Sequence, residues 1–243
     1  MESENLKEIT KLFEIGAHLG HRKSRLHPKA KKYVYQMVNS TSVIDLSITV
    51  KQLENAKNYL SSQAKQGKSI LVVATKKTAG PAMKKYCIEN KMPYITSKWL
   101  PGLITNFEEL KKNVTKLKDM KIQQSQGEWE KIVKHEKVKL TKDMAKLERL
   151  FGGLVELSKR PDIVIVVDSK KEKNAVKEAR EYNIPLVGLI DTNSNPDEIN
   201  FPILANDDVS TVVEYIMFDL LSSYHKNKIE KIVEPKVEKK LVN

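Results

Sequence analysis

The 243-residue chain has a single cysteine, and no run of apolar residues in it is longer than about five. One thiol forms no internal disulfide, which is typical of proteins of the reducing cytosol. A membrane-spanning helix needs about 20 apolar residues, and the acidic start MESENLKEITKLFEIG lacks the apolar region of a secretory signal peptide. These absences favour a cytoplasmic protein in which Cys87 is a small core residue of a helix.

Acidic residues are missing from two long stretches of the first hundred residues. No Asp or Glu occurs between Glu14 and Asp45, or between Glu54 and Glu89. Residues 1–100 hold 18 Lys and Arg against 7 Asp and Glu, so most of the formal net charge of +12 lies at one end of the chain. A one-sided positive surface is typical of proteins that bind a polyanion such as RNA. The alternative is a merely lysine-rich surface.

Glycine-rich nucleotide motifs are also missing. The turn after the apolar run ILVVA reads TKKTAGPA, which contains neither G-x-G-x-x-G nor G-x-x-x-x-G-K-[ST], so a nucleotide cofactor is not expected. Lys76 and Lys77 at the start of the next helix could still hold one backbone phosphate. His18 and His21 lie close together without partner cysteines, which is a weak metal signal. The alternative is that these histidines hydrogen-bond to the loop backbone.

Apolar runs that alternate with helical segments predict the fold class. We expect strands at 33–38, 69–74, 93–96, 163–168 and 185–190, and helices at 4–15, 47–66, 79–89, 172–182 and 208–226. Continuous apolar strands between helices indicate a parallel sheet covered by helices on both faces.

Residues 106–150 contain no strand pattern. Their apolar residues recur at spacings of three and four on both sides of the break QQSQGEW, which predicts two antiparallel helices packed along one seam. We therefore expect an α/β domain in two parts, 1–105 and 151–226, interrupted by a helical coiled-coil hairpin over 106–150. Residues 227–243 are expected to be a flexible tail.

Basic side chains are densest in the stretch RKSRLHPKAKK. It contains six candidate contacts with RNA: Arg22, Lys23, Arg25, Lys29, Lys31 and Lys32. Lysine suits phosphate as a point charge, and arginine can also fork onto phosphate or base edges. In the turn-rich stretch SKWLPGLITNF, Lys98 and Asn106 are further candidates. Trp99 could stack on a base or anchor the loop on the core.

The stretch DTNSNPDEINFPILANDD is acidic in a chain that is otherwise basic. Its Asn, Asp and Ser residues suit turns that they close with their own side chains, and Asn206 and Asp207 suit the cap of the last helix. We favour a folded hook whose charge faces away from RNA. The alternative is a nucleotide- or metal-dependent enzyme on the same sheet, which would use Asp168, Asp191 and Asp208.

Several motifs, taken in order, resemble the bacterial-type ribosomal protein S2 family of the small subunit. They are GAHLGH, HPK, TKK after a strand, WLPGLITN, LERLFGGL, PDIVIVVD, KEA and IPLVGLIDTNSNPDEINFPILANDD. The resemblance extends from about residue 8 to residue 226. It implies a Rossmann-like (flavodoxin-like) three-layer α/β domain with a parallel sheet and an inserted α-helical coiled-coil hairpin.

The same resemblance implies a function. Members of the family are structural constituents of the ribosome, bind small-subunit rRNA at the head–body junction and help to dock ribosomal protein S1 during translation. We therefore expect neither catalysis nor a small-molecule substrate, no cofactor apart from the weak metal signal, no membrane contact and no homo-oligomer. Three positions depart from the family pattern: Pro101 stands where glycine is usual, Ser97 where a longer polar side chain is common, and Asn195 where aspartate is usual.

Overall fold

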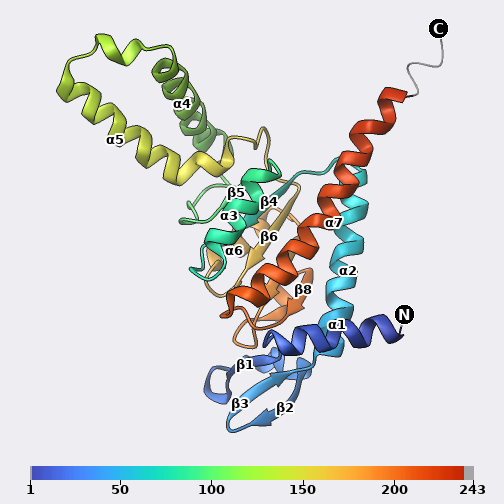
Figure 1. The fold of residues 1–243 in the computed structure, drawn as a ribbon. Helices are drawn as coiled ribbons and strands as arrows, with labels where there is room; N and C mark the ends of the chain where they lie inside the picture. The colour runs from blue at the N-terminus through green and yellow to red at the C-terminus, as the bar shows by residue number, and fades with distance from the viewer. Residues whose placement is uncertain (1, 238–243) are drawn as a thin grey trace.

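A five-stranded sheet lies at the centre of the computed structural model, which describes residues 2–237 (Figure 1). Its strand order is β5-β4-β6-β7-β8, and all of its pairings are parallel. The strands are β4 (Ile70–Val73), β5 (Tyr94–Ile95), β6 (Ile163–Val167), β7 (Leu186–Ile190) and β8 (Phe201–Leu204). The parallel sheet predicted from the continuous apolar runs is therefore confirmed.

Helices cover both faces of the sheet, because successive residues of a strand point to opposite sides. Ile70 and Val72 belong to a core cluster with residues of α1, α2, α3 and α7. Leu71 and Val73 belong to a second cluster with α6 and the loop after β5. The helices are α1 (Glu2–Glu14), α2 (Leu46–Lys65), α3 (Gly80–Glu89), α6 (Lys173–Glu181) and α7 (Ser210–Val237). The predicted three-layer, Rossmann-like architecture is confirmed.

A helical hairpin projects from the sheet domain, as the spacing of its apolar residues predicted (Figure 1). It consists of α4 (Phe107–Ser125) and α5 (Lys134–Phe151). Val114 and Leu117 of α4 are buried, and Leu147 of α5 packs against the same cluster. At the tip, Trp129 is buried in a single turn of 3₁₀ helix. The arm therefore has its own small apolar seam.

A second, antiparallel sheet precedes α2, and the sequence predicted only one of its strands. Its order is β1-β3-β2, from β1 (Leu19–Arg22), β2 (Val34–Val38) and β3 (Thr41–Ile44). Asn39 and Ser40 join β2 to β3 with φ of 47° and 63°, as a two-residue hairpin turn requires. Residues 18–32, for which the sequence predicted no helix or strand, thus contain β1 and most of two short 3₁₀ helices. Strands of four residues are too short to show a clear alternation of apolar and polar residues.

Several boundaries differ from those expected. α2 begins at Leu46, one residue before the expected start, and Asp45 caps it, since its carboxylate accepts the N–H of Ser47 at 2.9 Å. β8 was missed because it contains Pro202, which is tolerated there because β8 is an edge strand. α7 continues to Val237, through the boundary expected at residue 226. Residues 238–243 of the expected tail lie outside the described residues, and the flexibility of the tail stays a prediction.

Two simpler expectations can be compared with the structure directly. Cys87 is buried in α3, and burial raises the pKa of its thiol to about 12, so the expected role as an inert core residue is confirmed. None of the described helices combines the length and apolar character that crossing a membrane requires.

Candidate nucleic-acid interface

The basic segment, residues 22–32, is fixed to the carboxyl edge of the parallel sheet. The backbone N–H of His27 donates to the carbonyl of Thr192 at 2.8 Å, and the N–H of His21 donates to Thr192 Oγ1 at 2.9 Å. Ser42 Oγ donates to the carbonyl of His21 at 2.7 Å. Thr192 follows β7 by two residues, so the segment is held in a defined conformation by the end of a central strand.

Gly20 permits this close packing of the two sheets. A Cβ atom at this position would lie 2.6 Å from Ser42 Oγ and 2.9 Å from the side chain of Thr192. Any side chain would therefore push β1 away from the parallel sheet. The glycine of the motif HLGH is explained by the approach of the backbone to these two hydroxyl-bearing residues.

Most of the candidate contacts with RNA are exposed. They are Arg22, Lys23, Arg25, Lys29, Lys31, Lys32, Lys77, Lys98 and Asn106. Lys29 and Lys32 lie 2.9 Å and 3.7 Å from the Asp197 carboxylate, which partly neutralises them. Among the side chains that the structure describes, the other four cations of the basic segment have no carboxylate within 4.0 Å. Those four charges are the most available to phosphate.

Lys76 lies in a partly buried ion-pair network and corrects one sequence prediction. Its Nζ is 2.6 Å from Asp207 Oδ1, 2.7 Å from Asp208 Oδ1 and 3.7 Å from Asp168 Oδ2. Burial opposes the charge of the lysine, but its hydrogen bonds to Asp207 and Asp208 outweigh this and raise its pKa. The ammonium group neutralises carboxylates of the chain itself, and is not free to hold a phosphate.

The same network occupies the place where related folds bind nucleotides. The connections leave β4 and β6 in opposite directions along the sheet, and such a switch point is the usual nucleotide crevice. Asp168 follows β6, and Glu172 accepts the N–H of Thr75, after β4, at 3.2 Å. Lys76 contacts both Asp168 and Asp207. These side chains therefore connect the ends of β4 and β6 through contacts with one another. The arrangement agrees with the absence of a glycine-rich phosphate loop.

Trp99 is also corrected by the structure. Only 5% of the residue is exposed, and its indole N–H donates to Glu178 Oε1 at 3.0 Å. The two carboxylate oxygens of Glu178 also accept the N–H groups of Gly102 at 2.9 Å and Ile104 at 3.0 Å. The ring therefore anchors the loop on the core and has no free face for stacking on a base. The sequence signal for this contact, which we missed, is an acidic residue on the apolar face of α6.

The carboxylates of the acidic stretch lie against the cations of the chain. We expected their charge to face away from the RNA-binding side, but Asp197 pairs with lysines of the basic segment, and Asp207 and Asp208 pair with Lys76. The crossover from β7 to β8 brings Asp197 to the basic segment, and the residues after β8 bring Asp207 and Asp208 to Lys76. Through Asp197, the acidic stretch contacts two lysines of the basic segment.

The expected turns of this stretch are only partly confirmed. Asn195 Oδ1 accepts the N–H of Asp197 at 3.2 Å, which is the expected turn. Asn206 Oδ1 accepts the N–H of Asp208 at 2.9 Å. Because α7 begins at Ser210, Asn206 closes a turn before the helix and is not its cap.

Three groups at this edge are close enough to share a ligand. His21, Asp191 and Asp208 place ligand atoms within 4.8 Å of one another, and such donors suit zinc. His18 is not among them, since its ring stacks on Phe13 with centroids 4.2 Å apart. His21 Nδ1 lies 2.8 Å from Asp191, and this hydrogen bond raises the pKa of the imidazole. A proton on His21 can therefore satisfy the neighbouring carboxylates in place of a metal.

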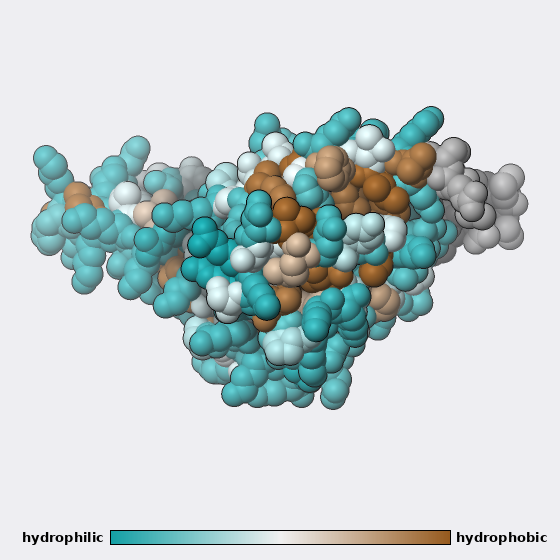
Figure 2. All heavy atoms as spheres, turned by 90° about the horizontal axis from the view of Figure 1, so that it is seen from below, coloured by the Kyte–Doolittle hydropathy of each residue, from teal (hydrophilic) through white to brown (hydrophobic). Residues whose placement is uncertain are grey.

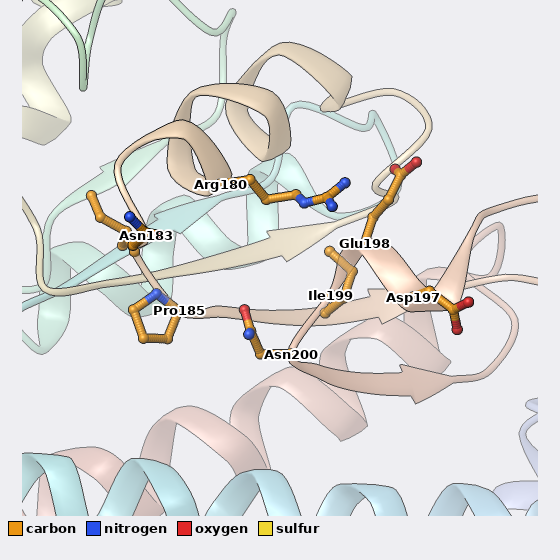
Figure 3. Close-up of a pocket in the computed structure, with 8 residues that line it drawn as sticks. Arg180, Asn183, Pro185, Asp197, Glu198, Ile199 and Asn200 are labelled. Atoms are coloured by element: carbon orange, nitrogen blue, oxygen red, sulfur yellow. The ribbon is translucent and has the colours of Figure 1, made fainter.

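A separate polar pocket of about 370 Å³ lies where β7 and β8 begin, at the edge of the sheet opposite its carboxyl edge (Figure 3). Asn200 lies beside it and accepts the N–H of Leu186, the first residue of β7, at 2.9 Å. Arg180 extends from α6 toward Glu198 across its rim (Figure 3). The lining contains no serine, threonine, cysteine or histidine, and its acidic residues are Asp197 and Glu198.

Comparison with known proteins gives one consistent family. The family model for Ribosomal protein S2 matches residues 12–226. The small ribosomal subunit protein uS2 of Dehalococcoides mccartyi strain 195 is 38% identical over 223 residues, which are 92% of this chain and 90% of that protein. The uS2 protein of strain BAV1 is 38% identical over 216 residues, 89% of this chain and 87% of that protein. These relatives are named as ribosomal proteins, which overturns the enzyme alternative. The chain belongs to the ribosomal protein S2 family.

Proposed function

We propose that the protein binds small-subunit rRNA through the basic segment together with Lys77, Lys98 and Asn106, at the head–body junction of the subunit in the cytoplasm. Its family makes it a structural constituent of the small ribosomal subunit. The observation that carries the proposal is the set of four cations without carboxylate partners on a backbone fixed to the sheet. Phosphates would take the place of those partners, and each contact would release counterions.

Removing charge from the basic segment is the first test. We expect the combined change Arg22→Gln, Lys23→Gln and Lys31→Gln to weaken rRNA binding, because three phosphate contacts are lost. Each lost contact reduces the slope of log K against log salt by roughly 0.7–0.9, so the slope should flatten by about 2 to 3. Filter binding to small-subunit rRNA over a salt series measures this change.

A matched variant separates this local effect from a loss of overall charge. Lys51, Lys65 and Lys84 are exposed lysines on α2 and α3, and their change to glutamine removes the same net charge. This control should keep nearly the original slope. Equal slopes for the two variants would show that the basic segment is not the binding surface.

We also propose that ribosomal protein S1 docks on an apolar surface of the N-terminal region. Figure 2 views the molecule from the end that carries β1–β3 and shows apolar residues gathered on that side. The most exposed large apolar side chains before α2 are Leu6, Phe13, Leu19, Tyr35, Met37 and Val38. Exposed apolar residues that gather on one side are typical of a protein contact, and the resemblance to the family names S1 as the neighbour.

The change Tyr35→Ala tests this docking surface. Tyr35 is 72% exposed, so its loss should leave the fold intact but reduce the retention of S1 on purified subunits about tenfold, since truncated interface aromatics commonly cost more than 1 kcal/mol. Quantitative mass spectrometry of the subunits measures S1. Ile88→Ala, at an exposed position of α3, is the control. Unchanged retention of S1 would refute this docking site.

The remaining expectations stay predictions. They are the absence of a homo-oligomer, of a small-molecule substrate, of membrane contact and of a cofactor.

A further inference from the structure

The two sheets of the molecule have four edge strands, and both edges of the parallel sheet are closed by the chain itself. At β8, the N–H of Leu204 donates to Gln52 Oε1 at 2.9 Å, and its carbonyl accepts Thr49 Oγ1 at 2.6 Å. β5 has only two residues, and Gly153 packs so closely against the carbonyl of Tyr94 that there is no room for a Cβ atom. Neither edge is open to another strand.

The antiparallel sheet has one closed edge and one open edge. On β1, the N–H of His21 donates to Thr192 Oγ1 at 2.9 Å, so the parallel sheet covers this side. β2 pairs only with β3, and in the part of the chain that the structure describes no hydrogen bond outside the sheet involves the backbone of Val34–Val38. This strand lies at the end of the molecule opposite the arm (Figure 1). Unpaired peptide groups at an edge are a ready template for pairing with another chain.

The pairing of β3 shows which peptide groups of β2 are free. Ile44 donates its N–H to the carbonyl of His18 at 2.8 Å, so this residue of β3 is directed toward β1. Directions alternate along an antiparallel strand, so Ser42, two residues earlier, is directed toward β1 as well. Met37 lies opposite Ser42. The N–H and C=O groups of Met37 therefore point away from β3, to the open side of the sheet.

The sequence of β2 does not protect this edge. Natural edge strands are usually protected by lysine, by proline or by a bulge, but VYQMV contains neither charge nor proline. Its bulge lies between Val34 and Gln36 and leaves the end at Met37 and Val38 regular. These two side chains are on residues that are 40% and 45% exposed and, as neighbours in a strand, they lie on opposite faces. An added strand would therefore find an apolar contact on each face.

We propose that β2 accepts an added strand: an extended, apolar and non-basic segment of the protein that docks on this surface. The inference rests on the proposed docking surface and narrows its contact to the edge of β2. Main-chain hydrogen bonds to Met37 would supply affinity, and the exposed side chains beside it would select the residues of the segment.

The charges around β2 indicate the character of the added strand. Lys31 and Lys32 precede it, and the N–H of Lys23 donates at 2.8 Å to the carbonyl of Ser40 in the turn that follows it. No Asp or Glu occurs in residues 15–44. A second copy of this chain or a basic tail would bring like charges together, which disfavours both. RNA binds lysine through its phosphates but has no row of peptide groups with which to continue the sheet.

Two substitutions at one position separate the role of the backbone from that of the side chain. Met37→Pro removes the outward N–H, and an edge strand tolerates proline where its N–H faces solvent. Met37→Thr removes the same side chain but keeps the N–H in a residue that favours strands. Circular dichroism and denaturant unfolding check both folds, and small subunits are assembled with each variant of the full-length chain. Quantitative mass spectrometry then measures the S1 that these subunits retain.

We expect subunits with Met37→Pro to retain about tenfold less S1 than those with Met37→Thr, because a main-chain hydrogen bond is lost and its acceptor is left unpaired. Equal retention in the two variants would overturn the inference, while reduced retention in Tyr35→Ala would leave the proposed docking surface intact. If Tyr35→Ala also retains S1 normally, the docking surface fails as well.

Hydrogen exchange of the unsubstituted protein provides a test that does not depend on the folding of a variant. The N–H of Met37 should exchange rapidly in the free protein and in its complex with rRNA alone, and at least about tenfold more slowly in subunits that carry S1. Exchange at the same rate in subunits with and without S1 would rule out the added strand. Slowing by rRNA alone, or by a raised concentration of the protein, would also rule it out and assign the edge to RNA or to a second copy.

Discussion

Replacing Lys76 by methionine is expected to destabilise the fold by about 3 kcal/mol at pH 8, because removal of one member of a buried ion pair leaves the other charge uncompensated. Three aspartate carboxylates converge on its ammonium group, and Asp207, which lies 2.6 Å away, is completely buried. Methionine keeps most of the volume of the side chain, so the loss of stability measures the effect of removing the positive charge. Denaturant unfolding measures the difference in the free energy of unfolding.

The loss of stability in Lys76→Met should be smaller at pH 5, because Asp207 is then protonated. Burial and the neighbouring charge of Asp168 raise the pKa of Asp207 to about 7 in the folded protein, against about 3.9 in an unfolded chain. The stability that this bound proton contributes is complete below about pH 4 and is lost as the pH rises through about 7. At pH 5 the carboxyl is neutral in both proteins, so Lys76 matters less.

A neighbouring lysine provides the control for this prediction. Lys77 is exposed, and its change to methionine should alter the free energy of unfolding by no more than about 0.5 kcal/mol at either pH. If Lys76→Met behaves like Lys77→Met, or if its effect is equal at pH 5 and pH 8, the network is not the one described.

The second large effect is expected for Glu178→Ala, which should destabilise the protein by about 4 kcal/mol. Its carboxylate accepts the buried N–H groups of Trp99 and Ile104 and the partly buried N–H of Gly102, at 2.9–3.0 Å. A hydrogen bond to a charged group contributes about 1.5–3 kcal/mol, and buried donors left without an acceptor add a further penalty. Thermal or denaturant unfolding measures the loss.

Two companion variants define what is lost with Glu178. Glu178→Gln keeps one acceptor oxygen and should cost roughly half as much. Glu181→Ala removes an exposed acid from the same helix and should change the free energy of unfolding by no more than about 0.5 kcal/mol. If Glu178→Ala is as stable as Glu181→Ala, the carboxylate does not hold the loop.

The parts of the fold that were predictable are those where the spacing of apolar residues in the sequence matches the positions that are buried. β4, β6 and β7 are buried on both faces and consist almost entirely of apolar residues, so their sequence is distinctive. The arm was predictable because its seam repeats every three or four residues. β1 and β3 were missed since their stability comes from pairing with each other, which a four-residue strand cannot show in its own sequence.

The candidate site was less predictable than the fold, because the pairing of charges depends on long-range contacts. Lys76 and Lys77 are indistinguishable in the sequence, yet the first is surrounded by carboxylates from residues 168–208 and the second is exposed. Trp99 follows an exposed lysine but points to the core, where Glu178 meets it. Charge density located the basic segment, but only the fold shows which of its charges are free.

The attachment of the basic segment to Thr192 has a consequence for the thermodynamics of recognition. A disordered arginine- and lysine-rich arm must lose conformational entropy when it meets RNA, at roughly 1–2 kcal/mol for each backbone residue that becomes ordered. Here much of that loss has already occurred during folding, through the backbone contacts of His21 and His27 with Thr192. More of the electrostatic attraction is then expressed as affinity, and the protein offers RNA a preorganised template.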